Sequence, residues 1–267
     1  MSNDMRARIA DFADVSETGL AREENEDSLL SLPDDGFFAV SDGMGGASAG
    51  ATASRIITRG LRAMTGTAGD SPGERKYLLQ QTLHKVNSDI AGFAAAHGYG
   101  TMGATVSSLL LDPWDTGKAD ICNIGDSRIY CFRQEELFLL TEDDVLSADP
   151  ARKHILTNYL GDKACMSAAW ERISVCPRDR FLLCTDGLSS VLPDEKIRDI
   201  LAAREDAEHT LRSLAEGIVR AGAPDNYSAI CIDIAETLPP DPEITPEDRE
   251  ESNYLYGIAE KRRDYGR

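Results

Sequence analysis

The sequence predicts an α+β fold in which β-sheets and helices pack as a sandwich. Short apolar or alternating segments, bounded by turn residues, recur along the chain and are typical of β-strands. Longer segments with apolar residues at helical spacing interrupt groups of these strands instead of following every strand. This grouping favours an α+β sandwich over the strand–helix alternation of a parallel sheet.

The predicted elements follow from these two periodicities. The strands are expected at residues 37–40, 104–111, 119–124, 128–132, 137–140, 180–184 and 228–234. The helices are expected at residues 48–64, 74–96 and 207–221. The first helix follows a Gly-rich turn, and the last places Leu211, Leu214 and Ile218 on one face.

Composition divides the chain into a globular part and a tail. Residues 1–236 have the mixed apolar and polar pattern of one domain, whereas residues 237–267 are acidic, contain several prolines and end in a basic stretch. We expect this tail to be solvated. A helix over 247–263, docked through Tyr254, Leu255 and Ile258, is the alternative.

Charge and hydropathy exclude several classes of partner. The net charge of −18 argues against nucleic acid and against anionic membranes. No apolar run is long enough to span a bilayer, and no secretory signal is evident, so we expect a cytoplasmic protein and a monomer. The cysteines form no C-x-x-C pair and are predicted to be reduced thiols, mostly in strands.

Acidic clusters are the most informative feature of the chain. They occupy residues 22–27, 41–46, 185–187 and 224–226, mostly beside predicted strands. A carboxylate at the end of a buried strand is unfavourable unless something neutralises it, and a divalent cation is the usual partner. Several such carboxylates brought together form an oxygen-only site suited to Mg²⁺ or Mn²⁺.

The residues around these aspartates indicate a reaction. In Asp42-Gly43 the glycine is expected to allow a sharp turn that points its carbonyl at the same ion, and Asp186-Gly187 repeats the pair. Arg22 can bind a phosphate through its guanidinium. Two divalent ions sharing a water lower its pKa from ~15.7 toward ~7, which supplies a hydroxide nucleophile. The residues therefore predict metal-assisted hydrolysis of a phosphate ester.

These motifs resemble those of the metal-dependent Ser/Thr protein phosphatases of the PP2C (PPM) family in their bacterial form. The matching stretches follow the family order and span roughly residues 5–235. They lie at residues 19–28, 38–46, 100–105, 123–130, 140–143, 155–161, 182–188 and 224–226. The resemblance implies a four-layer α-β-β-α sandwich of two antiparallel sheets flanked by helices, with the metal ions at one end.

The resemblance also implies roles for individual residues. Asp42 would bridge two Mn²⁺ or Mg²⁺ ions, and Asp186 and Asp225 would complete one ion. Glu26 and the carbonyl of Gly43 would serve the other.

Three further residues take implied roles around these ions. Asp27 would lie beside the ions and contact them either directly or through another ligand. Arg22 would hold the phosphate, and Asp126 would join Asp186 at a third, weaker ion. The substrates would be phosphoserine and phosphothreonine proteins, the targets of a Ser/Thr kinase in a signalling pathway.

The chain departs from the family pattern at three places. Ser190 replaces the acidic residue that often completes the third site, which argues against a firmly held third ion. Met44 stands where eukaryotic members carry a His, so protonation of the leaving group would fall to water. The segment 141–156, which forms a flap beside the active site in the family, is shortened, and this predicts a more open cleft.

Two alternatives compete with this interpretation. Residues 122–128 fit C-x-x-G-x-x-R, the phosphate loop of cysteine-dependent tyrosine phosphatases. The residues on either side of this segment have strand patterns, however, which predicts that Cys122 is a buried thiol. The second alternative is a catalytically weak or inactive PP2C-like regulator that binds phosphoproteins. The presence of Asp42, Asp186 and Asp225 argues against it.

Overall fold

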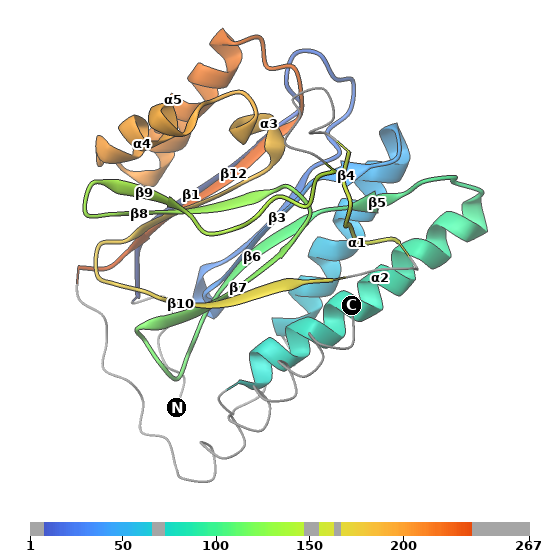
Figure 1. The fold of residues 1–267 in the computed structure, drawn as a ribbon, viewed down its shortest axis with the longest axis horizontal. Coiled ribbons are helices and arrows are strands. Elements are labelled where there is room, and N and C mark those ends of the chain that lie inside the picture. Colours follow the sequence, from blue (N-terminus) through green and yellow to red (C-terminus); the bar gives the residue numbers. More distant parts are fainter. Residues whose placement is uncertain (1–7, 66–72, 147–154, 163–166, 237–267) are drawn as a thin grey trace.

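Two antiparallel β-sheets stack face to face, and helices cover the outer face of each one (Figure 1). The computed structural model describes residues 8–65, 73–146, 155–162 and 167–236. The predicted tail, residues 237–267, lies outside the described residues, as do His154 and Cys165. The four layers confirm the predicted α-β-β-α class.

Sheet A has the strand order β1-β12-β11-β8-β9. Its strands are β1 (Ile9–Glu17), β8 (Arg128–Arg133), β9 (Glu136–Leu139), β11 (Arg180–Cys184) and β12 (Tyr227–Ile234). Its outer face is covered by α3 (Asp186–Ser189), α4 (Asp194–Ala202) and α5 (Ala207–Arg220).

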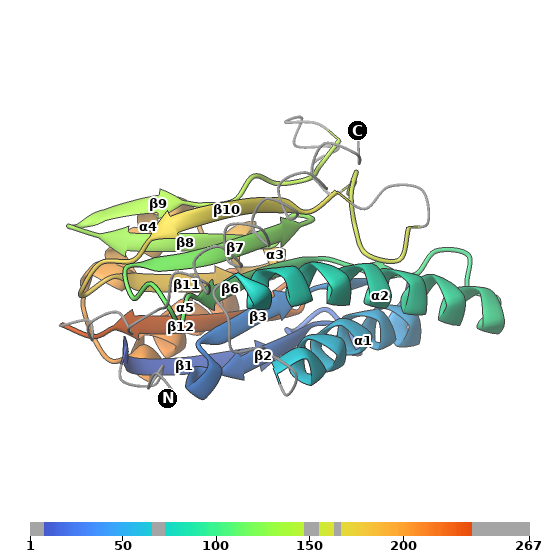
Figure 2. The same cartoon turned by 90° about the horizontal axis from the view of Figure 1, so that it is seen from below.

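Sheet B has the strand order β10-β7-β6-β3-β2. Its strands are β2 (Ser28–Leu32), β3 (Phe37–Ser41), β6 (Val106–Leu111), β7 (Lys118–Ile124) and β10 (Ala169–Ser174). The long helices α1 (Ala47–Thr65) and α2 (Glu74–His97) run side by side over its outer face (Figure 2). A short 3-10 helix, η2 (Pro33–Asp35), joins β2 to β3, and a small ribbon pairs β4 (Gly43–Met44) with β5 (Gly103–Ala104).

Strand alternation explains why both sheets are covered on both faces. In β3, Phe37 and Ala39 pack toward the helices, whereas Phe38 and Val40 pack into the apolar layer between the sheets. Successive strand side chains point to opposite faces, so a strand that is apolar throughout requires a neighbour on each side. The β11 strand, buried along its whole length, behaves in the same way against α5 and sheet B.

The central strands and the long helices match the sequence prediction, and the unpredicted strands of the two five-stranded sheets are edge strands. β1, β2 and β10 each close one edge of a sheet. An edge strand is only partly covered, so its apolar pattern is weak; in β10 only Ile173 is buried. The unpredicted helix α4 is short and buries only Ile197 and Leu201.

The predicted strand 104–111 is divided in the structure. The N–H of Thr105 leaves the ladder and donates to the carbonyl of Asp42 at 2.8 Å, which separates β5 from β6. None of the described helices combines the length and the apolar character that crossing a bilayer requires.

Candidate active site

The acidic motifs meet at one end of the sandwich, near β4, β5 and α3 (Figure 1). Asp42 follows β3, Asp186 opens α3 just after β11, Asp126 lies between β7 and β8, and Asp225 precedes β12. Stacking of the two sheets brings these strand ends together around a pocket of about 310 Å³. The pocket is lined by Arg22, Glu26, Asp42, Gly43, Met44, Gly45, Gly46, Thr105, Asp126, Leu156, Asp186, Asp225 and Asn226.

Hydrogen bonds to the backbone of Asp42 fix this residue in the pocket. Its N–H donates to Oγ1 of Thr105 at 2.9 Å, and Thr105 Oγ1 also shares a hydrogen bond of 2.7 Å with Ser127. Burial, followed by the nearby charges of Asp27 and Asp186, raises the pKa of Asp42 well above its usual range. The neighbouring Asp186 carboxyl thus favours the protonated form of Asp42.

The glycines after Asp42 and Asp186 are required by close contacts. A Cβ at Gly43 would lie 2.1 Å from the carbonyl oxygen of Gly50, and one at Gly187 would lie 1.8 Å from that of Asn226. Neither glycine is among those with a positive φ. Their φ angles therefore do not require glycine; the close approach of α1 and of the start of β12 does.

Asp27 lies behind the pocket and is not part of its lining. It is buried and accepts a hydrogen bond from Oγ1 of Thr185, the residue before Asp186, at 2.9 Å. Burial raises the pKa of Asp27 to about 7, despite hydrogen bonds from Ser228 and Thr185 that favour the charged form. Its position can orient Thr185 and the start of α3.

Asp126 faces the pocket from the turn between the two sheets. Burial and then the like charges of Asp186 and Asp143 raise the pKa of Asp126 to about 7. Ser190, which departs from the family pattern, ends α3 and is not among the residues that line the pocket.

Arg22 and Asp225 form an ion pair at the rim, with Nη2 and Oδ2 2.8 Å apart. The second oxygen of Asp225 accepts the N–H of Asn226 at 2.8 Å. The hydrogen bond to Asp225 raises the pKa of Arg22, which stays positively charged beside Glu26 and Asp42.

Asn226 is a structural residue of the site, and the sequence analysis assigned it no role. Its Oδ1 accepts the N–H of Glu26 at 2.9 Å, and its Nδ2 donates to the carbonyls of Thr18 and Glu24 at 2.8 and 2.9 Å. It therefore fixes the loop that carries Arg22 and Glu26 to the start of β12. The available signal was an Asn directly after a motif aspartate, a residue type that often bonds to backbone groups.

The donor set fits a hard divalent cation. Five carboxylate residues line one pocket, and Mg²⁺ and Mn²⁺ prefer such oxygen ligands. Within the described ranges, no three His, Cys, Asp or Glu side chains already converge as a ligand set. Asp225 instead contacts Arg22, and Asp42 lies beside the like-charged Asp186. The buried carboxylates of Asp27 and Asp126 have raised pKa values, which means that their charged forms are unfavourable; a bound cation would stabilise those charged forms.

The cysteine-based alternative is contradicted by the structure. Cys122 lies inside β7 and is fully buried, and burial raises the pKa of its thiol. A phosphate loop needs an accessible thiolate at the start of a helix, and neither condition is met. Among the described cysteines, Cys131, Cys184 and Cys231 are also buried strand thiols, and Cys176 is half-buried.

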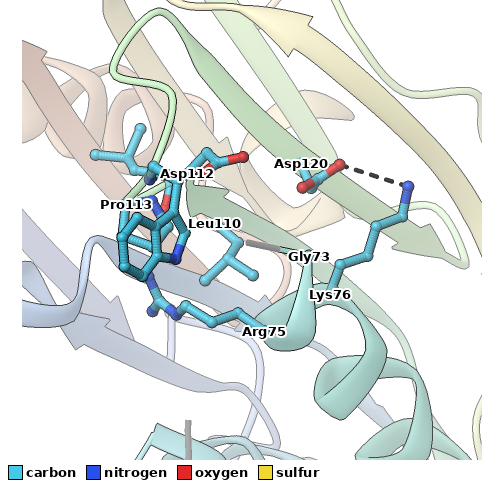
Figure 3. Close-up of a pocket in the computed structure, with 9 residues that line it drawn as sticks. Gly73, Arg75, Lys76, Leu110, Asp112, Pro113 and Asp120 are labelled. Carbon is cyan, nitrogen blue, oxygen red and sulfur yellow. Dashed lines mark hydrogen bonds and ion pairs between the residues drawn. The ribbon is translucent and has the colours of Figure 1, made fainter. Parts of the chain in front are cut away.

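A second cavity lies at the other end of sheet B and is too small for a substrate. It measures about 10 Å³, and Arg75, Lys76, Asp112 and Asp120 are among its lining residues (Figure 3). Lys76 Nζ points toward the Asp120 carboxylate at 3.5 Å, and the aromatic ring of Trp170 lies 5.7 Å from the same nitrogen. Arg75 donates to the carbonyls of Leu111 and Asp35, and Asp112 pairs with Arg172, so each of these charges has a partner within the fold, which indicates a structural role.

Comparisons with known proteins agree with this geometry. The sequence profile of the family described as Protein phosphatase 2C matches residues 21–221. The serine/threonine protein phosphatase PstP of Mycobacterium tuberculosis is 30% identical over 242 residues, which cover 84% of this chain and 45% of PstP. This chain therefore spans about half the length of that relative.

Solved structures show the same fold. PppA, described as a key regulatory component of T6SS in Pseudomonas aeruginosa, is 31% identical with a TM-score of 0.78, covering 85% of this chain and 99% of PppA. The catalytic domain of PstP in complex with two manganese ions is 28% identical with a TM-score of 0.72, covering 84% of this chain and 97% of that domain. The fold, the acidic pocket and the profile match lead to one conclusion: this chain belongs to the protein phosphatase 2C family.

Proposed function

We propose that this protein hydrolyses phosphoserine and phosphothreonine on other proteins with the help of Mn²⁺ or Mg²⁺. The observation that carries the proposal is the shared pocket, in which acidic residues from four distant motifs and one arginine face the same space. The relatives named as Ser/Thr protein phosphatases, one of them solved with two manganese ions, support it.

In this proposal, Asp42, Asp186 and Asp225 would hold one ion, and Glu26, the Gly43 carbonyl and Asp42 would hold another. When bound, the ions supply positive charge for the phosphoryl oxygens and lower the pKa of water so that it can act as a nucleophile. The buried carboxylates, whose charge is unfavourable in the metal-free pocket, provide the driving force for binding them.

The chain's own residues bind and orient the phosphate. Arg22 is half-exposed at the rim, and its guanidinium can form paired hydrogen bonds to phosphate oxygens. Its present partner, Asp225, is one of the proposed ligands, so uptake of a cation by Asp225 would free Arg22 for the phosphate. Leu156 and Met44 add apolar walls that reduce contact between the phosphate and bulk water.

The physiological partners in this proposal are phosphorylated proteins, the targets of a Ser/Thr kinase. The proposal retains the cytoplasmic location and the monomeric state expected from the sequence. Two ions are assigned, and a third ion at Asp126 is not required.

The decisive test is hydrolysis of p-nitrophenyl phosphate and of pSer, pThr and pTyr peptides with Mn²⁺, with excess EDTA, or after treatment with iodoacetamide. We expect activity on pSer and pThr peptides that EDTA removes and iodoacetamide leaves intact. Loss to iodoacetamide but not to EDTA would overturn the metal mechanism. Tight phosphopeptide binding without hydrolysis in either metal would support the binding-only regulator instead.

A further inference from the structure

Asp144 connects two separate segments beside the pocket. Its Oδ2 accepts the backbone N–H of Gly125 at 2.9 Å and Nδ2 of Asn158 at 2.8 Å. Its backbone makes the same two connections: its N–H donates to the Gly125 carbonyl at 3.0 Å, and its carbonyl accepts the N–H of Thr157 at 2.8 Å. Both the side chain and the main chain of one residue therefore join these segments.

The two segments form different walls of the pocket. Gly125 immediately precedes Asp126, whose carboxyl faces the pocket. On the other side, Asn158 lies two residues after Leu156, which also lines the pocket. Leu160 then pairs with Ala104 of β5 through two hydrogen bonds of 2.9 Å, and β5 pairs with Gly43–Met44. Asp144 thus lies between the Asp126 wall and the wall that leads to Gly43.

The neighbouring aspartate makes a different set of contacts. Asp143 receives Nε and Nη2 of Arg128 at 2.9 and 2.7 Å, and Arg128 also donates to the hydroxyl of Tyr130 at 2.9 Å. Asp143 therefore fixes an arginine of sheet A, whereas Asp144 reaches toward the pocket. The two adjacent carboxylates, which look equivalent in the sequence, serve different parts of the structure.

The conformation of the turn that carries Asp126 is restricted by close contacts. Gly125 has φ +101°, and a Cβ there would lie 2.5 Å from Cγ2 of Thr105, the residue that holds the Asp42 backbone. The Asp126 carboxyl also faces the like charge of Asp186, which favours movement away from the pocket. A bond to the Gly125 N–H opposes that movement.

We propose that Asp144 is a positioning residue that sets the separation between Asp126 and Leu156 across the pocket. The proposal rests on the proposed function, because it assigns Asp144 to the geometry of that same site. Asp144 itself touches neither the pocket space nor, in this proposal, the substrate. The two bonds accepted by one oxygen make the Asp126 turn and the segment 155–160 move together.

The chain offers variants that separate position from charge. Asp144→Asn keeps an oxygen that can accept both hydrogen bonds but removes the charge, and Asp144→Ala removes both. Glu142→Ala is the matched control, because Glu142 is exposed and its removal changes the net charge by the same amount. Asn158→Ala removes one of the two bonds to Asp144 from the opposite side, together with the two hydrogen bonds between Asn158 and Ser167.

The first readout is amide hydrogen exchange in excess EDTA, which requires no activity. We expect Asp144→Ala to accelerate exchange over residues 123–128 and 155–160 and to leave α5 unchanged. Asn158→Ala should accelerate exchange over 155–160 only, and Glu142→Ala over neither. If Asp144→Ala does not fold, Asp144→Asn and Asn158→Ala still decide the matter: wild-type exchange over 155–160 in Asn158→Ala would overturn the proposal.

The second readout is the Mn²⁺ dependence of p-nitrophenyl phosphate hydrolysis. Loss of a hydrogen bond to a charged acceptor predicts about a tenfold rise in KM or in the half-saturating Mn²⁺ concentration for Asp144→Ala, with a smaller change in kcat. Asp144→Asn should stay close to wild type. An Asp144→Asn variant as impaired as Asp144→Ala would show that the charge, not the position, matters. Wild-type inactivity with Mn²⁺ would refute the proposed function, while the exchange measurement would still test the role of Asp144.

Discussion

Replacing Asp126 by Asn measures how strongly burial and the neighbouring carboxylates disfavour the negative charge of Asp126 when metal is removed. Burial and the like charge of Asp186 raise the pKa of Asp126 from 3.8 to about 7 in the folded protein. Because the folded pKa lies above the unfolded value, this group's contribution to stability is complete below about pH 4 and is lost as the pH rises toward about 7. An Asn side chain has nearly the same shape and stays neutral, so the variant avoids this loss.

The size of the effect follows from the pKa difference. A rise from 3.8 to about 7 corresponds to about 4 kcal/mol at ~1.36 kcal/mol per pKa unit, and about half of it falls above pH 5.5. Solvent that reaches the pocket reduces this value, so the wild type should lose about 1–2 kcal/mol between pH 5.5 and pH 8 that Asp126→Asn retains. For a chain of this size, that equals a melting temperature about 2–8 °C higher for the variant at pH 8.

Thermal unfolding followed by circular dichroism, in excess EDTA at both pH values, provides the measurement. Asp34→Asn is the control, because Asp34 is exposed and its replacement changes the net charge equally. An equal decline of stability with pH in wild type and Asp126→Asn would refute the reasoning, as would the same gain in Asp34→Asn.

Four further outcomes are expected. Asp42→Ala and Asp186→Ala should reduce Mn²⁺-dependent hydrolysis of p-nitrophenyl phosphate to background, and near-wild-type rates in either would contradict their assignment as ligands. Arg22→Ala should raise KM for phosphopeptides about tenfold with kcat less affected, as steady-state kinetics would show, because it removes paired hydrogen bonds to the phosphate. Gly187→Ala should lower the free energy of unfolding by about 2–3 kcal/mol or prevent folding, since its Cβ would lie 1.8 Å from the Asn226 carbonyl. Gly92→Ala, in α2 with nothing within 4 Å of a new Cβ, should instead stabilise by about 0.5–1 kcal/mol in the same denaturant titration.

Local pattern was sufficient for the elements that are fully covered. β3, β11 and β12 are buried along nearly their whole length, and α1, α2 and α5 match the predicted helices closely. Their apolar periodicity lies within consecutive residues, so it can be recognised without knowing which element packs against them. The acidic motifs were visible for a related reason, because polar residues at the end of an apolar segment stand out.

Tertiary structure alone decided the features that depend on contacts between distant residues. The edge strands β1, β2 and β10 carry weak patterns and exist because a neighbouring strand offers its free hydrogen-bonding groups. The ion pair of Arg22 with Asp225 and the roles of Asn226 and Asp144 each join segments whose proximity no local pattern records.

The glycines after Asp42 and Asp186 show this division most clearly. The sequence motifs alone indicated that Gly43 and Gly187 accompany two candidate site aspartates. It suggested a sharp turn as the reason for the glycines, because local propensity is all that a single segment reveals. The structure supplies the reason: α1 and β12 pass so close to the aspartates that no side chain fits. Close packing between layers arises only when the chain has folded, so it cannot be recognised in a single segment.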